Sequence, residues 1–268
     1  VSRSLARLRD DLRDPLLVRA GNKLEPTPRA IALHAEIAPA LDLIEQALRG
    51  TADFDPSTEE RIFHVGMSDD IQLRFLPAIS SRLLNVMPKS RLIVLQTDYL
   101  RAGSMLADKT TSVVVGYLDQ LPAEAKIKKI SRVGYRAVMS KKASRINSVK
   151  AYAGRLHVLV TFAGDLKGYI DESLAAAAIE RDVLLSVSTF SVLPFVLEHT
   201  DRIATVPDHV AYALAKHNAL RSEPLPFSSP KFNLSIAWRA VTDRDPAEQI
   251  LREIIVEEIG RSAQSINA

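Results

Sequence analysis

The chain has 268 residues, of which 47% are hydrophobic and 25% are charged, and it contains no cysteine. This composition is ordinary for a globular protein, and it excludes disulfides, cysteine-ligated metals and thiol catalysis. The net charge is only +3, from 35 basic and 32 acidic side chains. No apolar run approaches the ~20 residues of a membrane span, and the N-terminus is too polar for a signal peptide, so we expect a cytosolic protein without a membrane partner.

Residues 1–12 are predicted to form an amphipathic helix, because Val1, Leu5, Leu8 and Leu12 fall on one stripe at helical spacing. The other side offers polar and basic groups that suit an anion such as DNA; these are Ser2, Arg3, Ser4 and Arg7. Residues 1–29 hold seven basic and four acidic side chains, so they account for the whole positive excess of the chain. Phosphate contacts need such a footprint, although a solvated surface helix is the alternative.

A small hairpin is predicted next, at 16–26, with turn chemistry around Gly21. Thr27 is the expected N-cap of a long helix that begins at Pro28 and stops near Gly50. Its apolar face is broad, and Pro39 is expected to kink it. We interpret it as a dimerisation helix, with packing in the protein's own core as the alternative.

Residues 50–60 are polar and turn-rich and form the predicted linker. Beyond it, short apolar runs alternate with helical patterns, which is typical of an α/β doubly wound domain. The expected strands include 61–67, 91–96, 112–118, 157–162, 183–188, 202–207 and 232–241, with helices between them. Asp245 and Glu248 are predicted to form a capping box for the final helix, at about 247–262.

Enzymatic and metal-binding signatures are not found in the sequence. It has no Walker loop, no GxGxxG and no GxSxG, and no two of its six histidines have metal-ligand spacing. We therefore predict no catalytic residue, no metal and no cofactor.

Two stretches carry a resemblance to a known family. The run "VSRSLARLRDDLRDPLLVR" followed by "LEPTPRA" resembles the recognition helix, wing and linker-helix start of bacterial LysR-type transcriptional regulators. "DRIATVP" and "WRAVTDRDPAEQILREI" are similar to late segments of the subgroup that responds to aromatic acids and flavonoids. The resemblance covers essentially the whole chain, and Val1 matches the first turn of the recognition helix. It implies that the first helices of the winged helix-turn-helix are missing before Val1.

The resemblance implies an architecture of three parts. Residues 1–27 would be a partial winged helix-turn-helix, 28–59 a linker and dimerisation helix with a hinge, and 60–268 a two-lobed, periplasmic-binding-protein-like effector domain. Lobe I would span about 60–132 and 239–262, and lobe II about 133–238. DNA contacts are assigned to Ser2, Arg3, Ser4, Arg7, Arg19, Lys23 and Thr27.

The effector is expected in the cleft between the lobes, because open α/β sheets bind ligands beyond the carboxyl ends of their strands. The strand ends place seven candidate residues there: Ser68, Thr97, Tyr117, Thr161, Phe162, Thr189 and Phe190. Hydroxyl donors, helix N-termini and an aromatic wall suit a small carboxylate. Helix capping is the alternative role for the hydroxyls. A cationic ligand is the alternative to a carboxylate, because Asp69, Asp70 and Asp98 lie near the same strand ends.

The predicted function is thus a DNA-binding regulator controlled by a small organic effector, acting as a homodimer or homotetramer on an inverted-repeat operator. RNA polymerase is a further expected partner if the protein is an activator. A free-standing solute-binding protein of the same fold is the alternative, and an enzyme comes third.

Overall fold

A computed structural model describes residues 2–21, 23–49, 54–176 and 178–267. The chain divides into two compact units, 1–54 and 55–268. Side chains at 2, 3, 20, 23, 39–49 and 263–267 lie outside the description. None of the helices in the described ranges is both long and apolar enough to cross a membrane.

The first unit contains the predicted helix, hairpin and long helix. α1 (Ser2–Leu12) is followed by the antiparallel pair β1 (Leu17–Ala20) and β2 (Lys23–Pro26), then by α2 (Pro28–Arg49). Thr27 caps α2 as predicted, because its Oγ1 accepts a hydrogen bond from the amide of Ala30 at 3.1 Å. Arg9 ties α1 to the hairpin: its Nε donates to the carbonyl of Pro15 at 2.7 Å.

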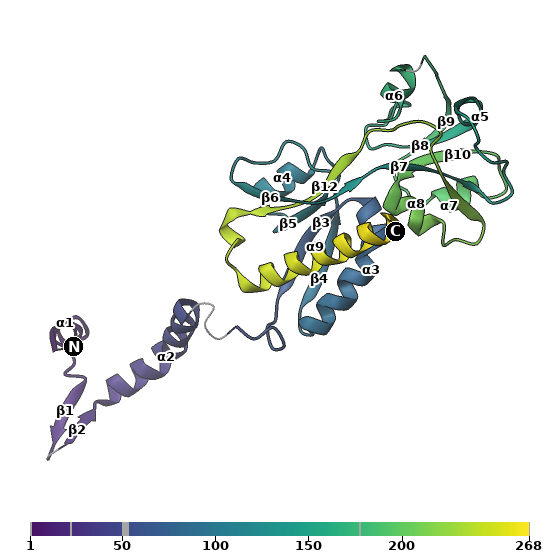
Figure 1. Cartoon of the computed structure of the whole chain (residues 1–268). Coiled ribbons are helices and arrows are strands. Elements are labelled where there is room, and N and C mark those ends of the chain that lie inside the picture. The colour runs from purple at the N-terminus through teal and green to yellow at the C-terminus, as the bar shows by residue number, and fades with distance from the viewer. Residues whose placement is uncertain (1, 22, 50–53, 177, 268) are drawn as a thin grey trace. The chain divides into compact units, whose positions relative to one another are not determined.

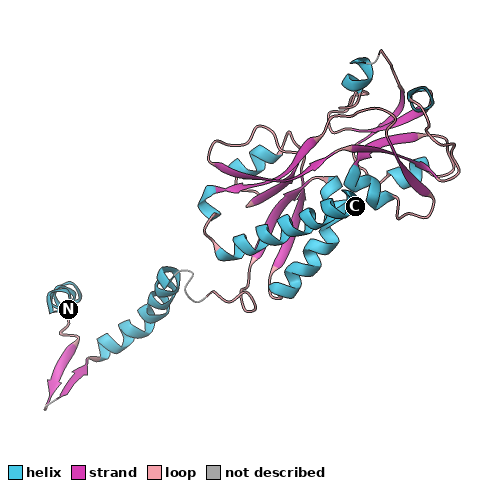
Figure 2. Ribbon diagram, in the orientation of Figure 1, coloured by secondary structure: helices cyan, strands magenta, loops and turns pink. Residues whose placement is uncertain are grey.

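The second unit contains two five-stranded sheets (Figures 1 and 2). The first sheet has the order β4-β3-β5-β12-β6, and it consists of β3 (Ile62–Met67), β4 (Arg91–Gln96), β5 (Val113–Gly116), β6 (Ala125–Val133) and β12 (Phe232–Arg239). Its helices are α3 (Asp69–Val86), α4 (Ala102–Ala107) and α9 (Pro246–Asn267), the last preceded by a 3-10 turn at Ala240–Thr242. We call this sheet with its helices the first lobe.

The second lobe is built on the sheet β11-β7-β10-β8-β9. Its strands are β7 (Tyr135–Ser140), β8 (Leu156–Val160), β9 (Asp182–Val187), β10 (Ile203–Pro207) and β11 (Leu220–Pro224). Its helices are α5 (Val149–Ala153), α6 (Asp171–Ala176), α7 (Leu193–Leu197) and α8 (Asp208–Leu214).

Both sheets are mixed, and both are covered on two faces. In the first lobe, β3 runs parallel to β4 and β5, whereas β12 is antiparallel to β5 and β6. Here α3 and α9 lie side by side (Figure 1), and Val114 and Ala237 pack against α4. In the second lobe, Val138 packs with α7 and α8, whereas its neighbours Ala137 and Met139 pack with α5 and α6. This alternation along β7 is the period of two that strands impose.

The chain crosses between the lobes twice, once at Gly134 and once between β11 and β12. The predicted return to lobe I at residue 239 is too late: β12 pairs with β5 and β6, so the first lobe already resumes at Phe232. The sequence alone missed this because the position of β12 is fixed by pairing partners far away in the chain.

Candidate functional site

Ser68 stands where β3 ends and α3 begins, at the edge of the first sheet that faces the second lobe. Its side chain is buried, with 7% exposed, and its hydroxyl makes no hydrogen bond of standard geometry with the described residues. Capping of α3, the alternative role offered by the sequence, does not explain it, because the hydroxyl caps nothing. Gly116 at the end of β5 has a φ of +155° and leaves room for it; a Cβ there would come within 2.9 Å of Oγ.

The next two residues, Asp69 and Asp70, reach across to the second lobe. Asp69 Oδ2 accepts a hydrogen bond from the amide of Phe190 at 2.6 Å, and Asp70 Oδ2 lies 2.8 Å from Nε2 of His209 at the start of α8. Burial raises the pKa of Asp69, and the hydrogen bond from Phe190 only partly offsets this. Both carboxylates of α3 are therefore committed to contacts between the lobes.

The Asp70–His209 pair is almost fully buried, with 8% of Asp70 and 2% of His209 exposed. Burial alone would raise the pKa of Asp70, but the hydrogen bond and charge of His209, with a smaller contribution from the Ser68 hydroxyl, hold that pKa below its usual value. Asp70 is thus an ionised acceptor, so Nε2 of His209 must carry the hydrogen. The other ring nitrogen, Nδ1, is buried without a partner among the described residues.

Packing around this pair reinforces the junction of the lobes. The ring of Phe75 lies 5.4 Å from that of His209, and the guanidinium of Arg74 lies 4.9 Å from the ring centre of Tyr212 on α8. Asp208 clamps the first crossing: its Oδ2 accepts from the amide of Gly134 at 2.9 Å, and its own amide donates to the Gly134 carbonyl at 3.0 Å. The N-terminus of α8 therefore fixes both the crossing strand and α3.

A row of aromatic rings runs along the crossing strands from one lobe to the other. Tyr99 and Tyr117 lie 6.0 Å apart, Tyr117 and Phe232 5.8 Å, Phe232 and Tyr135 5.6 Å, and Tyr135 and Tyr169 6.1 Å. Burial raises the pKa of Tyr135, and the charges of Tyr169 and Asp70 raise it further. Tyr117 and Tyr169 are 41% and 49% exposed.

Four members of this row, Tyr99, Tyr135, Tyr169 and Phe232, were not predicted from the sequence. The candidate residues were those that follow the C-terminal ends of strands, whereas Tyr135 and Phe232 begin the strands that follow a crossing. The available signal was the aromatic residue directly after Gly134.

The remaining predicted effector residues have varied surroundings. Thr97 is 1% exposed, and its hydroxyl donates weakly to the carbonyl of Asp98 at 3.4 Å. Thr161 is occupied in its own turn, where its hydroxyl donates to Asp165 at 3.1 Å. Thr189 accepts from the hydroxyl of Ser191 at 3.3 Å.

Of the expected aromatic wall of Phe162, Phe190 and Tyr117, the two phenylalanines pack against the core of the second lobe with α7 and α8, whereas Tyr117 is exposed. The tyrosine row is the more accessible aromatic surface at the junction. Among the predicted residues, the structure brings Ser68 to the end of β5 and connects its neighbour Asp69 to Phe190.

The predicted DNA-contacting residues lie in the first unit. Ser4, Arg7 and Arg19 have exposed side chains, whereas the side chains of Ser2, Arg3 and Lys23 lie outside the described residues. The hydroxyl of Thr27 is not free for a phosphate, because it donates to Asp14 Oδ1 at 2.8 Å as well as capping α2.

Two shallow hollows lie away from the lobe junction. One, of about 330 Å³, is lined by Lys128, Trp238 and residues of α9. The other, of about 300 Å³, adjoins the end of β7 in the second lobe.

Comparisons with known proteins give a consistent result. The family described as the LysR substrate binding domain matches residues 57–260. The transcriptional activator NagR of a Ralstonia species is 30% identical over 263 residues, covering 96% of this chain and 86% of the relative. NahR of Pseudomonas putida is 28% identical over 260 residues, covering 96% and 87%. The crystal structure of the regulatory domain of MexT, a transcriptional activator in Pseudomonas aeruginosa, is 40% identical, has a TM-score of 0.69, and covers 75% of this chain and 99% of that one.

Proposed function

The chain belongs to the LysR-type transcriptional regulators, and on this premise we propose that a small aromatic carboxylate controls it by binding at the lobe junction. Regulators of this family bind operator DNA and small-molecule effectors and form oligomers.

The observation that carries the proposal is the buried hydroxyl of Ser68, which makes no hydrogen bond of standard geometry with the described residues and acts only on the Asp70 carboxylate that His209 already engages. A ligand acceptor that gives this hydroxyl a well-aligned hydrogen bond gains binding free energy. Thr97 lies at the end of the neighbouring strand and Tyr117 just beyond Gly116. The exposed tyrosine rings beside this point offer apolar faces to a planar ligand.

The charges at the junction favour a carboxylate over an amine. A cationic ligand would be held by free carboxylates, but Asp69 and Asp70 already accept hydrogen bonds from Phe190 and His209. Neutral hydroxyl donors are the groups left for a ligand, and these suit an acceptor such as a carboxylate.

A thermal-shift screen of the full chain tests this with aromatic carboxylates, aliphatic carboxylates and aromatic amines. A ligand at a hundred times its dissociation constant adds about 2.7 kcal/mol of stability. Ser68→Ala, Thr97→Val and Thr189→Val should each reduce the shift while leaving the unliganded melting temperature nearly unchanged. Ser81→Ala, an exposed serine on the same helix α3, is the matched control and should keep the full shift.

Two results would contradict the proposal. Stabilisation by amines but not by carboxylates would reject the ligand class. If carboxylates still raise the melting temperature of all three variants, the effector site does not lie at these strand ends.

We further propose that α2 mediates a homodimer or homotetramer, and that α1 and the hairpin bind an inverted-repeat operator. The exposed Arg7 and Arg19 support the second assignment. If the protein is an activator, RNA polymerase is its expected partner.

A further inference from the structure

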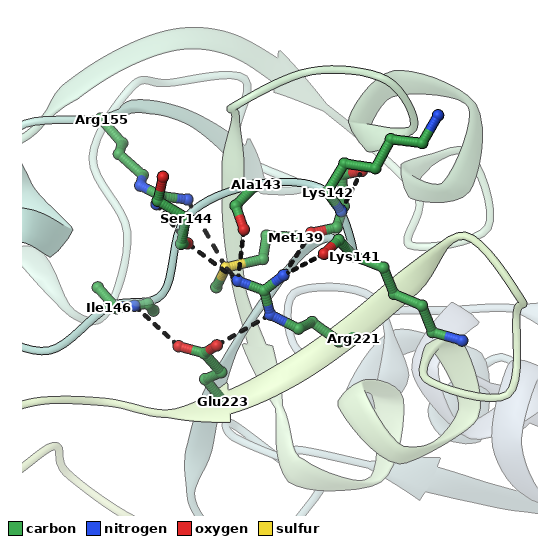
Figure 3. Close-up of polar contacts among 10 residues, drawn as sticks. Met139, Lys141, Lys142, Ala143, Ser144, Ile146, Arg155, Arg221 and Glu223 are labelled. Carbon is green, nitrogen blue, oxygen red and sulfur yellow. Dashed lines mark hydrogen bonds and ion pairs between the residues drawn. The ribbon is translucent and has the colours of Figure 1, made fainter.

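Arg221 on β11 organises the loop that follows β7, and Figure 3 shows the arrangement. Nη1 of its guanidinium donates to the carbonyls of Ser140 at 3.1 Å and Lys141 at 2.6 Å. Nη2 donates to the carbonyls of Ala143 at 2.7 Å and Ser144 at 2.9 Å. One planar fork thus holds four carbonyls of residues 140–144, which curls the loop around it.

A carboxylate and a second arginine complete this support. Glu223 accepts from Nε of Arg221 and from the amide of Ile146, both at 2.9 Å. Burial would raise the pKa of Glu223, but these contacts keep that pKa below its usual value. Arg155 also donates to the carbonyl of Ser144, at 2.5 Å. The backbone of residues 140–146 is therefore fixed, and the charge of Arg221 is neutralised.

The side chains of this loop carry exposed positive charge. Lys141, Lys142 and Arg145 are all exposed, and none of them forms an ion pair with a described residue, although the charge of Arg145 helps to lower the pKa of Glu223. In Figure 3 the two lysine side chains extend away from Arg221. The stretch "SKKASRINSVK", residues 140–150, contains four basic residues and no acidic one.

We propose that this cationic loop, residues 140–146, is a docking surface for an acidic segment of a partner protein. Because the backbone is already held in place, little conformational entropy is lost on binding. Exposed charges of one sign steer and select an oppositely charged partner. The hollow of about 300 Å³ beside the loop, lined in part by Lys142, Ala143 and Thr200, offers room for side chains of that segment.

Acidic groups next to the hollow favour a peptide over a nucleic acid. Asp201 lines the hollow, and Glu198 pairs with His199 beside it at 3.3 Å. A phosphate backbone carries a charge at every nucleotide and would be repelled there. A peptide carries its carboxylates on separate side chains and can place neutral residues over Asp201.

The test uses the full chain with a labelled peptide of alternating glutamate and alanine and, in parallel, a DNA duplex of matched charge. Carbodiimide coupling of the bound peptide, mapped by mass spectrometry, should mark Lys141 and Lys142 above all other lysines. The variant Lys141→Gln/Lys142→Gln/Arg145→Gln should weaken peptide binding about tenfold. The matched control Lys128→Gln/Lys129→Gln/Arg132→Gln removes the same charge from exposed positions of β6 and should change the affinity less than about twofold.

Arg221→Lys adds a second test, because it keeps the charge but loses the fork. This variant should weaken peptide binding although every exposed cation of the loop is kept. If Arg221→Lys fails to fold, the coupling map and the triple variant still test whether the loop binds the peptide. Coupling spread evenly over the lysines, or equal losses in the two triple variants, would overturn the proposal. If the loop variant Lys141→Gln/Lys142→Gln/Arg145→Gln loses more affinity for the DNA duplex than for the peptide, the partner is a nucleic acid instead.

Discussion

His209 Nε2 lies 2.8 Å from Asp70 Oδ2, and this buried contact joins α8 of the second lobe to α3 of the first. His209→Phe keeps a ring beside Phe75 but leaves the carboxylate of Asp70 buried and unpaired. We expect a loss of about 3 kcal/mol in the free energy of unfolding, measured by urea titration. The double variant Asp70→Asn/His209→Phe should recover part of the loss, whereas strictly additive effects would mean that the two side chains are not coupled.

His209→Phe should also change how the free energy of unfolding depends on pH, and the sign of this change follows from the pKa of Asp70. In the native protein the pKa of Asp70 is below its ordinary value of 3.8, so the pair stabilises the fold above that pH and the stabilisation is lost as the pH falls. In His209→Phe the unpaired, buried Asp70 should have a raised pKa. The difference in unfolding free energy between the two proteins should therefore begin to shrink above pH 3.8, as the pH falls through the raised pKa of the variant, and should go on shrinking until Asp70 of the native protein is protonated. A constant difference from neutral pH downward would contradict this assignment.

His157 provides a second titration, in the second lobe. Its side chain is fully buried, and Nε2 lies 3.0 Å from the carbonyl of Tyr152. Burial, aided by the positive charge of Arg181, lowers its pKa from 6.5 to about 4. Between these values the unfolded chain binds the proton and the folded chain does not, so stability should fall by up to ~3 kcal/mol as the pH drops from 6.5 towards 4.

His157→Phe should flatten this dependence, because its ring cannot be protonated. Denaturant titrations of both proteins at neutral pH and at points between pH 4 and 6.5 measure the difference directly. Parallel pH profiles for the native protein and the variant would show that His157 does not titrate in this range.

Arg181 and Asp171 form a bidentate ion pair beside Tyr152. The Nε–Oδ1 distance is 2.7 Å and the Nη2–Oδ2 distance is 2.9 Å, and only 2% of the Arg181 side chain is exposed. Arg181→Met should lower the free energy of unfolding by about 3 kcal/mol, because it strands a partly buried carboxylate. Arg202→Met, in the same lobe but without an ion pair to a described residue, should cost less than about 0.5 kcal/mol. Equal losses of unfolding free energy in the two variants would show that the introduced methionine, and not the broken ion pair, lowers the stability.

The strands and helices with continuous apolar runs were predictable from the sequence. β3 and β8 read as buried strands, and Ser68 could be placed at a strand end, because both inferences depend on neighbouring residues only. β4 was also predicted as a buried strand, but its residues are exposed or half-buried because it forms the edge of its sheet. β11, "LRSEP", was missed because it is polar and ends in proline, and its pairing with β7 is fixed by the tertiary structure. The Asp70–His209 contact joins residues 139 positions apart, so no local pattern could indicate it.

α2 is proposed as an oligomerisation helix, and its described part exposes Ile31 at 59% and Ile37 at 41%. Such an apolar face would be covered by a second copy of the chain. Light scattering should give the mass of at least a dimer, and Ile37→Glu should reduce it towards the monomer. Glu36→Lys, at the adjacent exposed position, should leave the mass unchanged. Leu41→Glu extends the test to the part of α2 whose side chains lie outside the described residues.

Arg7 provides the last prediction, on DNA binding by the first unit. Its side chain is exposed on α1, whereas Arg9 on the same helix is engaged with the carbonyl of Pro15, so Arg7 is free to meet a phosphate or a base edge. Duplexes selected from a random library by this protein serve as the probe. If Arg7 meets a phosphate, Arg7→Ala should reduce the slope of log affinity against log salt by about 1 and weaken all duplexes alike. If it reads a base, the loss should be about 1–3 kcal/mol and confined to the selected sequence. Lys128→Ala removes an exposed cation of the second unit and should leave both the salt slope and the affinity unchanged. The same loss in both variants would mean that only the net charge of the protein matters. If Arg7→Ala loses no affinity, α1 does not belong to the DNA interface.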